Sequence, residues 1–516
     1  MVRGNQHKPL PPLSLIGEHI LRYWKMRKND KDILQLLCAK HLNGTRYGMG
    51  LTRFREMCEA MGLFRSRKEG HNIESIRPAM LRLRAQYPKA GQREMSSLLF
   101  HEENMSVQRS VIVAYFAVYE AELVRQRRAR RLKRKRFWAA GVNDVWTVDQ
   151  HDKWKYKFGL CLHSGLDPFI GRFLWEKNWW TNSNPRLILS YYLDAVEESG
   201  SMPLVSQSDP GVENFGLANG HTLLRHWHDP SLKGTLQHRW MKEKKNVMPE
   251  IGWSQLRHRW TPGFEDILEI GTNNRWYDPS ILLQALVFRW VFIPWLQREL
   301  DAYRDRVNNT AKRADRNKVL PHGVPNHMYE APEDFGVLDF KIKVDPAAIA
   351  YVRNLYAPPD HEVFELVPKD FAKLVTEFYA QIGNPLITRT NVWDIYMALL
   401  ARFEHLDNLH RIPAQLDEQW GYSLTMAHDD YEDDLALIPN LTPLHNGSEV
   451  VGPNGYYYMG GVNNGLGLND EQSLQLDAMM DRDDPLPEGE MELVEGDQLV
   501  AWFSDEEEEP GDEIFD

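Results

Sequence analysis

Several features are scarce in this sequence, and each absence excludes a class of protein. Only three cysteines occur among 516 residues, and none belongs to a Cys-x-x-Cys pair. A disulfide scaffold and a cysteine-based zinc site are therefore excluded. No apolar run approaches the roughly 18 residues that a membrane-spanning helix needs, and the first twenty residues lack the apolar segment of a secretory signal. We expect no membrane segment and a cytoplasmic or nuclear protein.

Basic residues are nearly absent from the last hundred residues, where 417–516 hold one Arg against 27 acids. Residues 1–136 show the reverse, with 29 Lys and Arg against 12 acids, while 137–416 are almost balanced. The net charge of -12 is thus a cancellation between two oppositely charged ends. A basic end of this kind favours a nucleic-acid partner.

Composition and periodicity divide the chain into five parts. Residues 1–30 are predicted to be a loose arm with one short helix, and 31–136 a helical region. Residues 137–330 are predicted to be an α/β core and 331–416 an α+β region of unknown role. The acidic tail, 417–516, has the composition of a disordered segment. Its aromatic residues among acids suit a protein partner, and a solubilising role is the alternative.

The helical region contains a pattern typical of a helix-turn-helix. Two short helices with a tight turn place the start of the second helix in the major groove, where Ser106, Gln108 and Arg109 would contact DNA. Ser106 is expected to cap this second helix. A plain three-helix bundle without DNA contact is the alternative. The predicted helices are Ile76–Tyr87, Gly91–His101 and Val107–Tyr119.

A strongly basic run follows, in which nine of the thirteen residues 124–136 are Arg or Lys. Like charges without intervening acids repel one another unless an anion neutralises them. The run indicates nucleic-acid contact, nuclear import or both, and a solvated charged face is the alternative. The candidate DNA-binding residues in it are Arg127, Arg128, Arg130, Arg131, Lys133, Arg134, Lys135 and Arg136.

Beyond residue 137, short apolar runs alternate with turn-rich segments and then with helical patterns. The order βββαβαβα predicts a mixed sheet covered by helices on both faces. The predicted strands are 144–150, 157–163, 169–175, 203–208 and 233–240, and the predicted helices are 185–198, 212–227 and 249–260.

Two acids are placed where this topology puts ligands. Asp149 lies inside the first, buried strand, where a carboxylate is costly unless it is bonded or bound to a cation. Asp209 closes the fourth strand, and carboxyl ends of strands are the ligand edge of open α/β sheets. The two strands are expected to lie side by side, so that both acids share a divalent metal such as Mg²⁺.

A third carboxylate would complete such a site, and Glu243 and Glu250 are the candidates. Glu250 is favoured because it stands in the first turn of a predicted helix, whereas Glu243 lies in a basic stretch. Cations around a carboxylate cluster suit a polyanion lying across it, and local pairing with the acids is the alternative. The candidate cations are Lys244, Lys245 and Arg257.

Four segments together resemble the integrase core domain of DDE transposases and retroviral-type integrases. They are V-W-T-V-D-Q-H-D-K at 145–153, G-L-D-P-F-I-G-R at 165–172, S-D-P-G-V-E-N at 208–214 and N-V-M-P-E-I-G-W-S-Q-L-R at 246–257. The resemblance implies a ribonuclease-H-like fold, and it is strongest to transposon-derived proteins. It also implies DNA as the partner and two Mg²⁺ or Mn²⁺ ions as cofactors.

By this resemblance Asp149, Asp209 and Glu250 form a catalytic and metal-binding triad, supported by Asn246 and Trp253. The surroundings depart from the family pattern at two points, after Asp167 and before Glu250. The sequence therefore predicts a nuclear protein that cleaves DNA and transfers strands, acting as an oligomer on DNA. A domesticated, inactive DNA-binding regulator is the alternative, and a nuclease without transposition is a weaker third hypothesis.

Overall fold

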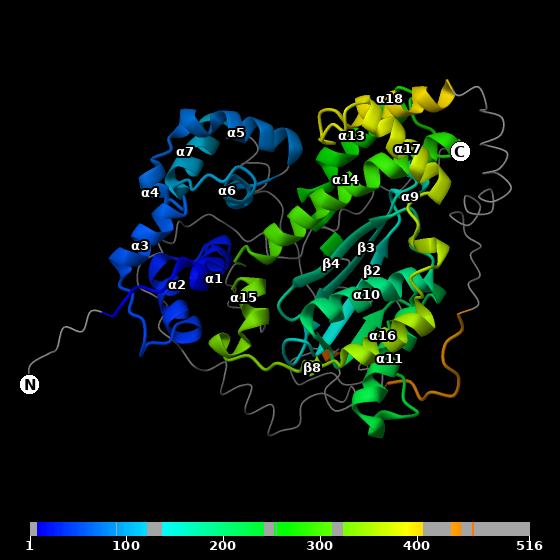
Figure 1. Cartoon of the computed structure of the whole chain (residues 1–516), viewed down its shortest axis with the longest axis horizontal. Coiled ribbons are helices and arrows are strands. Elements are labelled where there is room, and N and C mark those ends of the chain that lie inside the picture. Colours follow the sequence, from blue (N-terminus) through cyan, green and yellow to red (C-terminus); the bar gives the residue numbers. More distant parts are fainter. Residues whose placement is uncertain are drawn as a thin grey trace, which may run out of the picture.

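The computed structural model describes most of the chain, and the structural statements below concern the described residues. These are residues 8–88, 90–120, 137–241, 252–253, 255–257, 259–311, 323–405, 435–444 and 457–458. Helices make up the N-terminal part, and a five-stranded sheet with helices on both faces forms the centre (Figure 1). The predicted helical region followed by an α/β core is confirmed.

The first helices fold into an N-terminal lobe, residues 13–69, with its own hydrophobic core. Ile16, Ile20 and Tyr23 recur at helical spacing and belong to one buried cluster with Ile33 and Phe54. The predicted short helix of residues 1–30 is present as α1, but its apolar face is packed into this cluster, so the predicted loose arm is wrong for the helix. The lobe comprises α1 (Leu13–Lys25), α2 (Asp30–Leu36), η1 (Leu37–His41), α3 (Leu51–Ala60) and α4 (Ser66–Glu69).

The next three helices form a three-helix unit, residues 73–119, which matches the predicted helix pattern. Asn72 and Ser75 form a reciprocal capping box at its first helix. The connection before the last helix spans residues 102–108, longer than the 3–4 residues of a tight helix-turn-helix turn. The helices are α5 (Ile73–Gln86), α6 (Gln92–His101) and α7 (Arg109–Tyr119).

The central sheet has the strand order β4-β3-β2-β6-β7. Strand β2 pairs antiparallel with β3 and parallel with β6, and β6 pairs parallel with β7. This order confirms the predicted mixed sheet, in which the first and fourth predicted strands are neighbours. The strands are β2 (Val145–His151), β3 (Cys161–Asp167), β4 (Arg172–Trp179), β6 (Val205–Ser208) and β7 (His238–Trp240).

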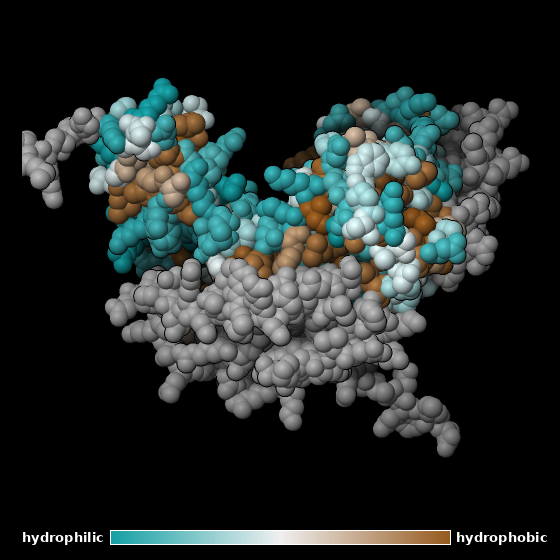
Figure 2. Space-filling view, turned by 90° about the horizontal axis from the view of Figure 1, so that it is seen from below, coloured by the Kyte–Doolittle hydropathy of each residue, from teal (hydrophilic) through white to brown (hydrophobic). Residues whose placement is uncertain are grey.

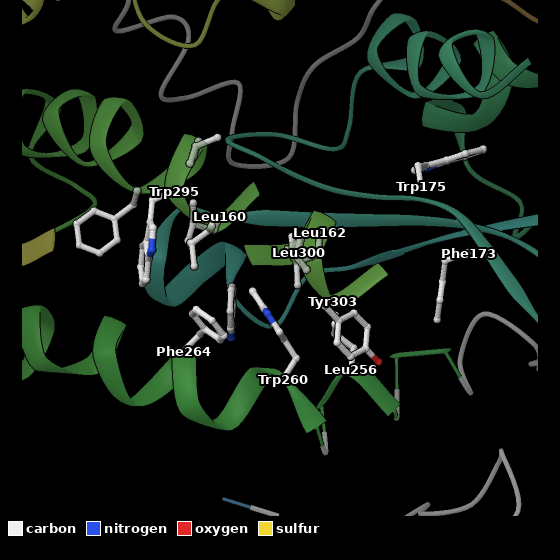
Figure 3. Close-up of a cluster of buried hydrophobic side chains, with 14 of the residues drawn as sticks. Leu160, Leu162, Phe173, Trp175, Leu256, Trp260, Phe264, Trp295, Leu300 and Tyr303 are labelled. Atoms are coloured by element: carbon white, nitrogen blue, oxygen red, sulfur yellow. The ribbon is translucent and has the colours of Figure 1, made fainter. Parts of the chain in front are cut away.

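Helices cover both faces of this sheet. One face packs against α10 (Pro185–Ser199) and α11 (Phe215–His228), where the rings of Trp146 and Tyr192 meet. The other face packs against α13 (Thr261–Asn273) and the long α14 (Leu282–Asn308). Figure 3 shows this second layer, with Trp260 and Phe264 directed toward Leu160 and Leu162 of the sheet side. The remaining short elements here are α9 (Lys155–Phe158), β5 (Ser201–Met202), η2 (Val212–Asn214) and η3 (Pro230–Leu232).

The region after α14 shares the core of the central sheet. Val352, Phe371 and Trp393 belong to the same buried cluster as the sheet residues, so 346–405 is not a separate unit. The one strand described in this region, β8 (Ile342–Lys343), pairs with β5 of the core. The helices are α15 (Pro325–Glu330), η4 (Pro332–Phe335), α16 (Pro346–Tyr356), η5 (Glu362–Phe364), α17 (Lys369–Gln381) and α18 (Val392–Glu404).

Part of the predicted tail returns to the core. Residues 435–444 hydrogen-bond along its surface: Leu236 N–H donates to the Thr442 carbonyl at 2.9 Å, and Thr442 N–H donates to Gly234 at 2.8 Å. The Asn219 side chain bonds the backbone of Ala436 and Ile438. The predicted separate tail over 417–516 is therefore wrong for this segment, and β9 (Tyr457–Tyr458) also pairs with β1 (Phe137–Trp138).

A buried ionic joint connects the three-helix unit to the core. The Glu94 carboxylate of α6 accepts a hydrogen bond from Arg306 of α14 at 2.7 Å and lies 2.9 Å from the guanidinium of Arg259. Arg306 is only 3% exposed and lies 3.6 Å from Glu102 as well. Figure 2 shows the surface hollowed between the side that carries the N-terminal helices and the rest of the molecule. The ion pairs of Glu94 thus connect the three-helix unit to the core beside this hollow.

Candidate active site

The first two predicted acids lie on neighbouring parallel strands, Asp149 within β2 and Asp209 directly after β6. The register pairs Val145 with Val205 and Thr147 with Gln207. The paired residues end there, and Asp149 and Asp209 each lie two residues beyond the last pair, toward the same end of the two parallel strands. Adjacent strands are about 4.8 Å apart, so the backbones that carry the two acids leave this pairing side by side.

Asp149 is held by a side chain from the helical residues that follow the core strands. The indole N–H of Trp253 donates to Asp149 Oδ2 at 3.1 Å. Trp253 is buried, and its ring stacks on His151 with 5.2 Å between ring centroids. This hydrogen bond orients the Asp149 carboxylate, which is a contact that a supporting role of Trp253 would require.

His151 is surrounded by cations. Burial, followed by the charges of Lys153 and Arg257, lowers its pKa to about 4. Its imidazole is therefore neutral at ordinary pH. Lys153 and Arg257 are both exposed, and their charges act on His151, two residues from Asp149, which suits attraction of a polyanion. By contrast, His163 is a core histidine that accepts a hydrogen bond from the Trp175 indole at 3.0 Å.

Asp209 lies immediately after β6, at the surface of the protein. Partial removal from water raises the pKa of its carboxyl. A further acid, Glu213 in η2, lies close enough that the Asp209 charge contributes to its raised pKa, after the larger effect of burial. Gln150 and Asn214 both donate hydrogen bonds to Glu213. The sequence did not single out Glu213, although it stands four residues after Asp209 on the same loop.

Several predicted site residues lie outside the described residues. Among the described part of the chain, no group of three or more His, Cys, Asp or Glu side chains forms a metal cluster. The third predicted carboxylate falls in the gap after residue 241, so the complete triad stays a prediction. The residues in question are Glu250, Lys244, Lys245, Asn246, Arg127, Arg128, Arg130, Arg131, Lys133, Arg134, Lys135 and Arg136.

The residues that are described fit a hard divalent cation. Asp149 and Asp209 supply only oxygen donors, which Mg²⁺ and Mn²⁺ prefer. One is half-buried and the other is exposed, so an ion reaches them from solvent.

The predicted DNA-reading residues lie at the start of α7, as expected, with one correction. The helix begins at Arg109 with Gln108 as its N-cap residue, and Gln108 and Arg109 are exposed. The predicted cap by Ser106 is wrong, because the helix begins three residues later, at Arg109. The Ser106 backbone N–H donates to the Glu69 carboxylate at 2.7 Å. This bond attaches the segment to the N-terminal lobe.

A second buried carboxyl lies in the same cross-strand row as Asp149. Asp149 is paired with Ser164 of β3, and Ser164 is paired with Glu176 of β4. The Ser164 hydroxyl donates to Glu176 Oε1 at 3.1 Å. Burial raises the pKa of Glu176 to about 8, although this bond and Arg304 oppose the shift. Glu176 is therefore protonated at neutral pH.

Glu176→Gln is expected to stabilise the protein above pH 8 and to leave it nearly unchanged below pH 5. The raised pKa makes the folded state bind a proton that the unfolded state releases, so stability falls as pH rises from about 4.5 to about 8. The amide keeps the acceptor for Ser164 and removes this loss, which is on the order of a few kcal/mol. Thermal melting across pH 5 to 9 measures the effect, and equal slopes for both proteins would contradict it.

Trp253→Phe is expected to weaken Mn²⁺ binding about tenfold. The phenyl ring keeps most of the packing on His151 but removes the N–H that orients Asp149, and groups that orient a metal ligand typically affect affinity by 10–100-fold. Isothermal titration with Mn²⁺ measures this. Trp154→Phe serves as the control, because Trp154 is an equally buried core indole. Equal weakening in both variants would argue for a general packing effect.

Two features define the class of this domain. The strand order with helices on both faces is ribonuclease-H-like, and one carboxylate lies within β2 while the other directly follows the parallel neighbour β6. Residues 137–330 match the family model described as the integrase core domain. The resemblance seen in the sequence is thereby confirmed for this part of the chain, which is the kind of domain found in integrases and transposases. A search of the curated proteins found no match.

An integrase-type domain implies DNA as its partner and divalent metal as its usual cofactor. None of the helices in the described ranges is both long and apolar enough to cross a bilayer.

Proposed function

We propose that this protein binds DNA and performs metal-dependent phosphodiester cleavage and strand transfer. The observation that supports the proposal is the parallel pairing of β2, which contains Asp149, with β6, which Asp209 directly follows. Asp149, Asp209 and Glu250 would hold two Mg²⁺ or Mn²⁺ ions. Such a pair of ions activates the attacking oxygen and stabilises the leaving oxygen in phosphodiester chemistry.

The chain's own side chains would prepare this reaction. Trp253 fixes the orientation of Asp149 through its indole N–H. The ring of Trp253 in turn stacks on His151, which holds the indole in place. Lys153 and Arg257 would contact phosphates of the DNA, because both are exposed cations whose charges act on His151, two residues from Asp149.

The three-helix unit and the basic run would place the DNA. Gln108 and Arg109 would contact base edges from the start of α7, and the basic run 124–136 would follow the phosphate backbone. This run would also direct the protein to the nucleus. We further propose that the protein acts as an oligomer on DNA, and that the acidic tail has a protein partner.

The deciding experiment is a cleavage and strand-transfer assay with the full chain and the DNA ends of the element that encodes it. Product is expected with Mg²⁺ or Mn²⁺ and none with EDTA or Ca²⁺. DNA binding without any product, under either metal, would favour the inactive DNA-binding regulator.

Replacing Arg127, Arg128, Arg130 and Arg131 by Ser is expected to reduce the salt dependence of DNA binding. Each lost phosphate contact lowers the slope of log Kd against log salt by about 0.9, so the slope should fall by roughly three to four. Fluorescence anisotropy with a labelled duplex measures it. Arg353→Ser is the control, since Arg353 pairs with Asp194 and Glu197 on the protein itself. An unchanged slope would show that the run does not contact phosphates.

A further inference from the structure

The end of β6 is where the backbone leaves the sheet beside the candidate site. Asp209 follows the last strand residue, and Pro210 and Gly211 then turn the chain. Pro210 has no N–H and cannot extend the ladder. The carbonyl of Asp209 instead accepts hydrogen bonds from the Ser208 hydroxyl at 2.9 Å and from Asn214 Nδ2 at 3.2 Å. The position of Asp209 therefore depends on these two side chains.

The Ser208 hydroxyl is itself one link in a buried chain of hydrogen bonds. His238 of β7 lies with Nε2 3.0 Å from Ser208 Oγ and with Nδ1 2.8 Å from Ser206 Oγ. Ser206 and Ser208 are fully buried and His238 is 1% exposed, with Trp240 packed 4.3 Å from its ring. The imidazole thus bridges two residues of the neighbouring strand in a site closed to water.

The protons in this chain can be assigned from the donors available. Ser208 uses its one proton toward the Asp209 carbonyl, so His238 must donate from Nε2 to Ser208. A neutral imidazole then accepts at Nδ1, and Ser206 supplies that proton. Burial lowers the pKa of His238 to about 3, so the imidazole is neutral. Each donor in this series of hydrogen bonds has one acceptor, and the last acceptor is the backbone carbonyl of Asp209.

We infer that His238 is a positioning residue for Asp209. It fixes the Ser208 hydroxyl, which fixes the peptide that carries the second carboxylate of the candidate metal site. This inference rests on the proposed function, because it assigns Asp209 to metal binding. A buried network of this type resists rotation of its last member, since any change leaves a donor or acceptor unpaired.

The test is Mn²⁺ binding by the full chain, measured by titration calorimetry. His238→Phe is expected to weaken Mn²⁺ binding about tenfold or more, as loss of a group behind a metal ligand typically does. His238→Gln is expected to restore much of the affinity, because its amide N–H₂ reaches toward Ser208. Ser208→Ala removes the last link with little change in volume and is expected to weaken binding like His238→Phe.

His221→Phe is the matched control. His221 is equally buried and bonds the Tyr192 hydroxyl at 2.6 Å, but it contacts the Leu204 carbonyl and not Ser208. A comparable loss of thermal stability with unchanged Mn²⁺ affinity is expected for it.

The outcomes separate the inference from the proposed function. Wild-type protein that binds no Mn²⁺ would overturn the proposed function and the inference with it. Mn²⁺ binding that is equal in wild type, His238→Phe and Ser208→Ala would overturn only the inference. Should His238→Phe fail to fold, Ser208→Ala against His221→Phe decides the question.

Discussion

Asp149→Asn is expected to lower metal-dependent DNA cleavage by about a thousandfold. The amide keeps the size of the side chain and an acceptor for the Trp253 indole, but it removes the charge that holds the metal. Loss of several kcal/mol of transition-state stabilisation corresponds to this factor, at about 1.4 kcal/mol for each tenfold change in rate. Asp209→Asn is expected to have a similar effect. Cleavage rates at saturating Mg²⁺ measure both.

Asp152→Asn is the matched control for this prediction. Asp152 lies three residues from Asp149 and accepts a hydrogen bond from Asn182 at 2.7 Å. It is not expected to hold the metal, so its substitution should change the rate by less than about tenfold. DNA affinity without metal should be the same in all three variants, which separates catalysis from binding. Full activity in Asp149→Asn would refute the site assignment.

Glu94→Ala is expected to lower the free energy of unfolding by about 3–5 kcal/mol. Glu94 is the acceptor between Arg259 and Arg306, and Arg306 is almost fully buried. Without Glu94, buried Arg306 keeps only its longer contact to Glu102, at 3.6 Å. Removing one partner of a buried pair is far more costly than losing the pair as a whole. Equilibrium urea denaturation measures the change. The three-helix unit and the core are expected to unfold together in the wild type.

Two comparisons test the cause of this loss. The double variant Glu94→Met with Arg306→Met replaces the charges by side chains of similar length, and it should be much more stable than Glu94→Ala. Glu103→Ala removes an ion pair with the exposed Arg82 on the same unit and should change stability little. A small effect of Glu94→Ala would show that Arg306 is satisfied without it.

Much of the core could be predicted because its strands are apolar runs with clear ends. Pro185, for example, opens α10 in the first turn, where its missing N–H costs nothing. The second strand was predicted about four residues early. Phe158 and Leu160 suggest a strand, but α9 occupies 155–158 and ends at Gly159 with a left-handed φ of 68°. A helix of one turn is too short to show the spacing of apolar residues by which a helix is predicted from sequence.

The places of Asp149 within β2 and of Asp209 just after β6 could be predicted, because the apolar runs of these strands are marked in the sequence. The side chains that hydrogen-bond around the site could not be predicted, because such contacts depend on how neighbouring strands are aligned in the sheet. Glu176 contacts Ser164 only through a pairing that includes a shift between Gly165 and Leu166. His238 bridges Ser206 and Ser208, which point to the same face because side chains alternate along a strand. The sequence does not indicate that β7, which carries His238, is the strand that pairs with them. The family resemblance assigned Trp253 a supporting role, but only the folded structure shows that its indole donates a hydrogen bond to Asp149.

The return of residues 435–444 to the core has a consequence for synthesis on the ribosome. Strand β7 is an edge of the sheet, and the backbone just before it pairs with Thr442, which is made about two hundred residues later. At 5–20 residues per second, this part of the edge waits roughly 10–40 seconds for its partner. During that time the newly made domain exposes backbone groups that can pair with another chain. Nascent chains that stop before residue 435 should therefore depend on chaperones more than the finished protein does.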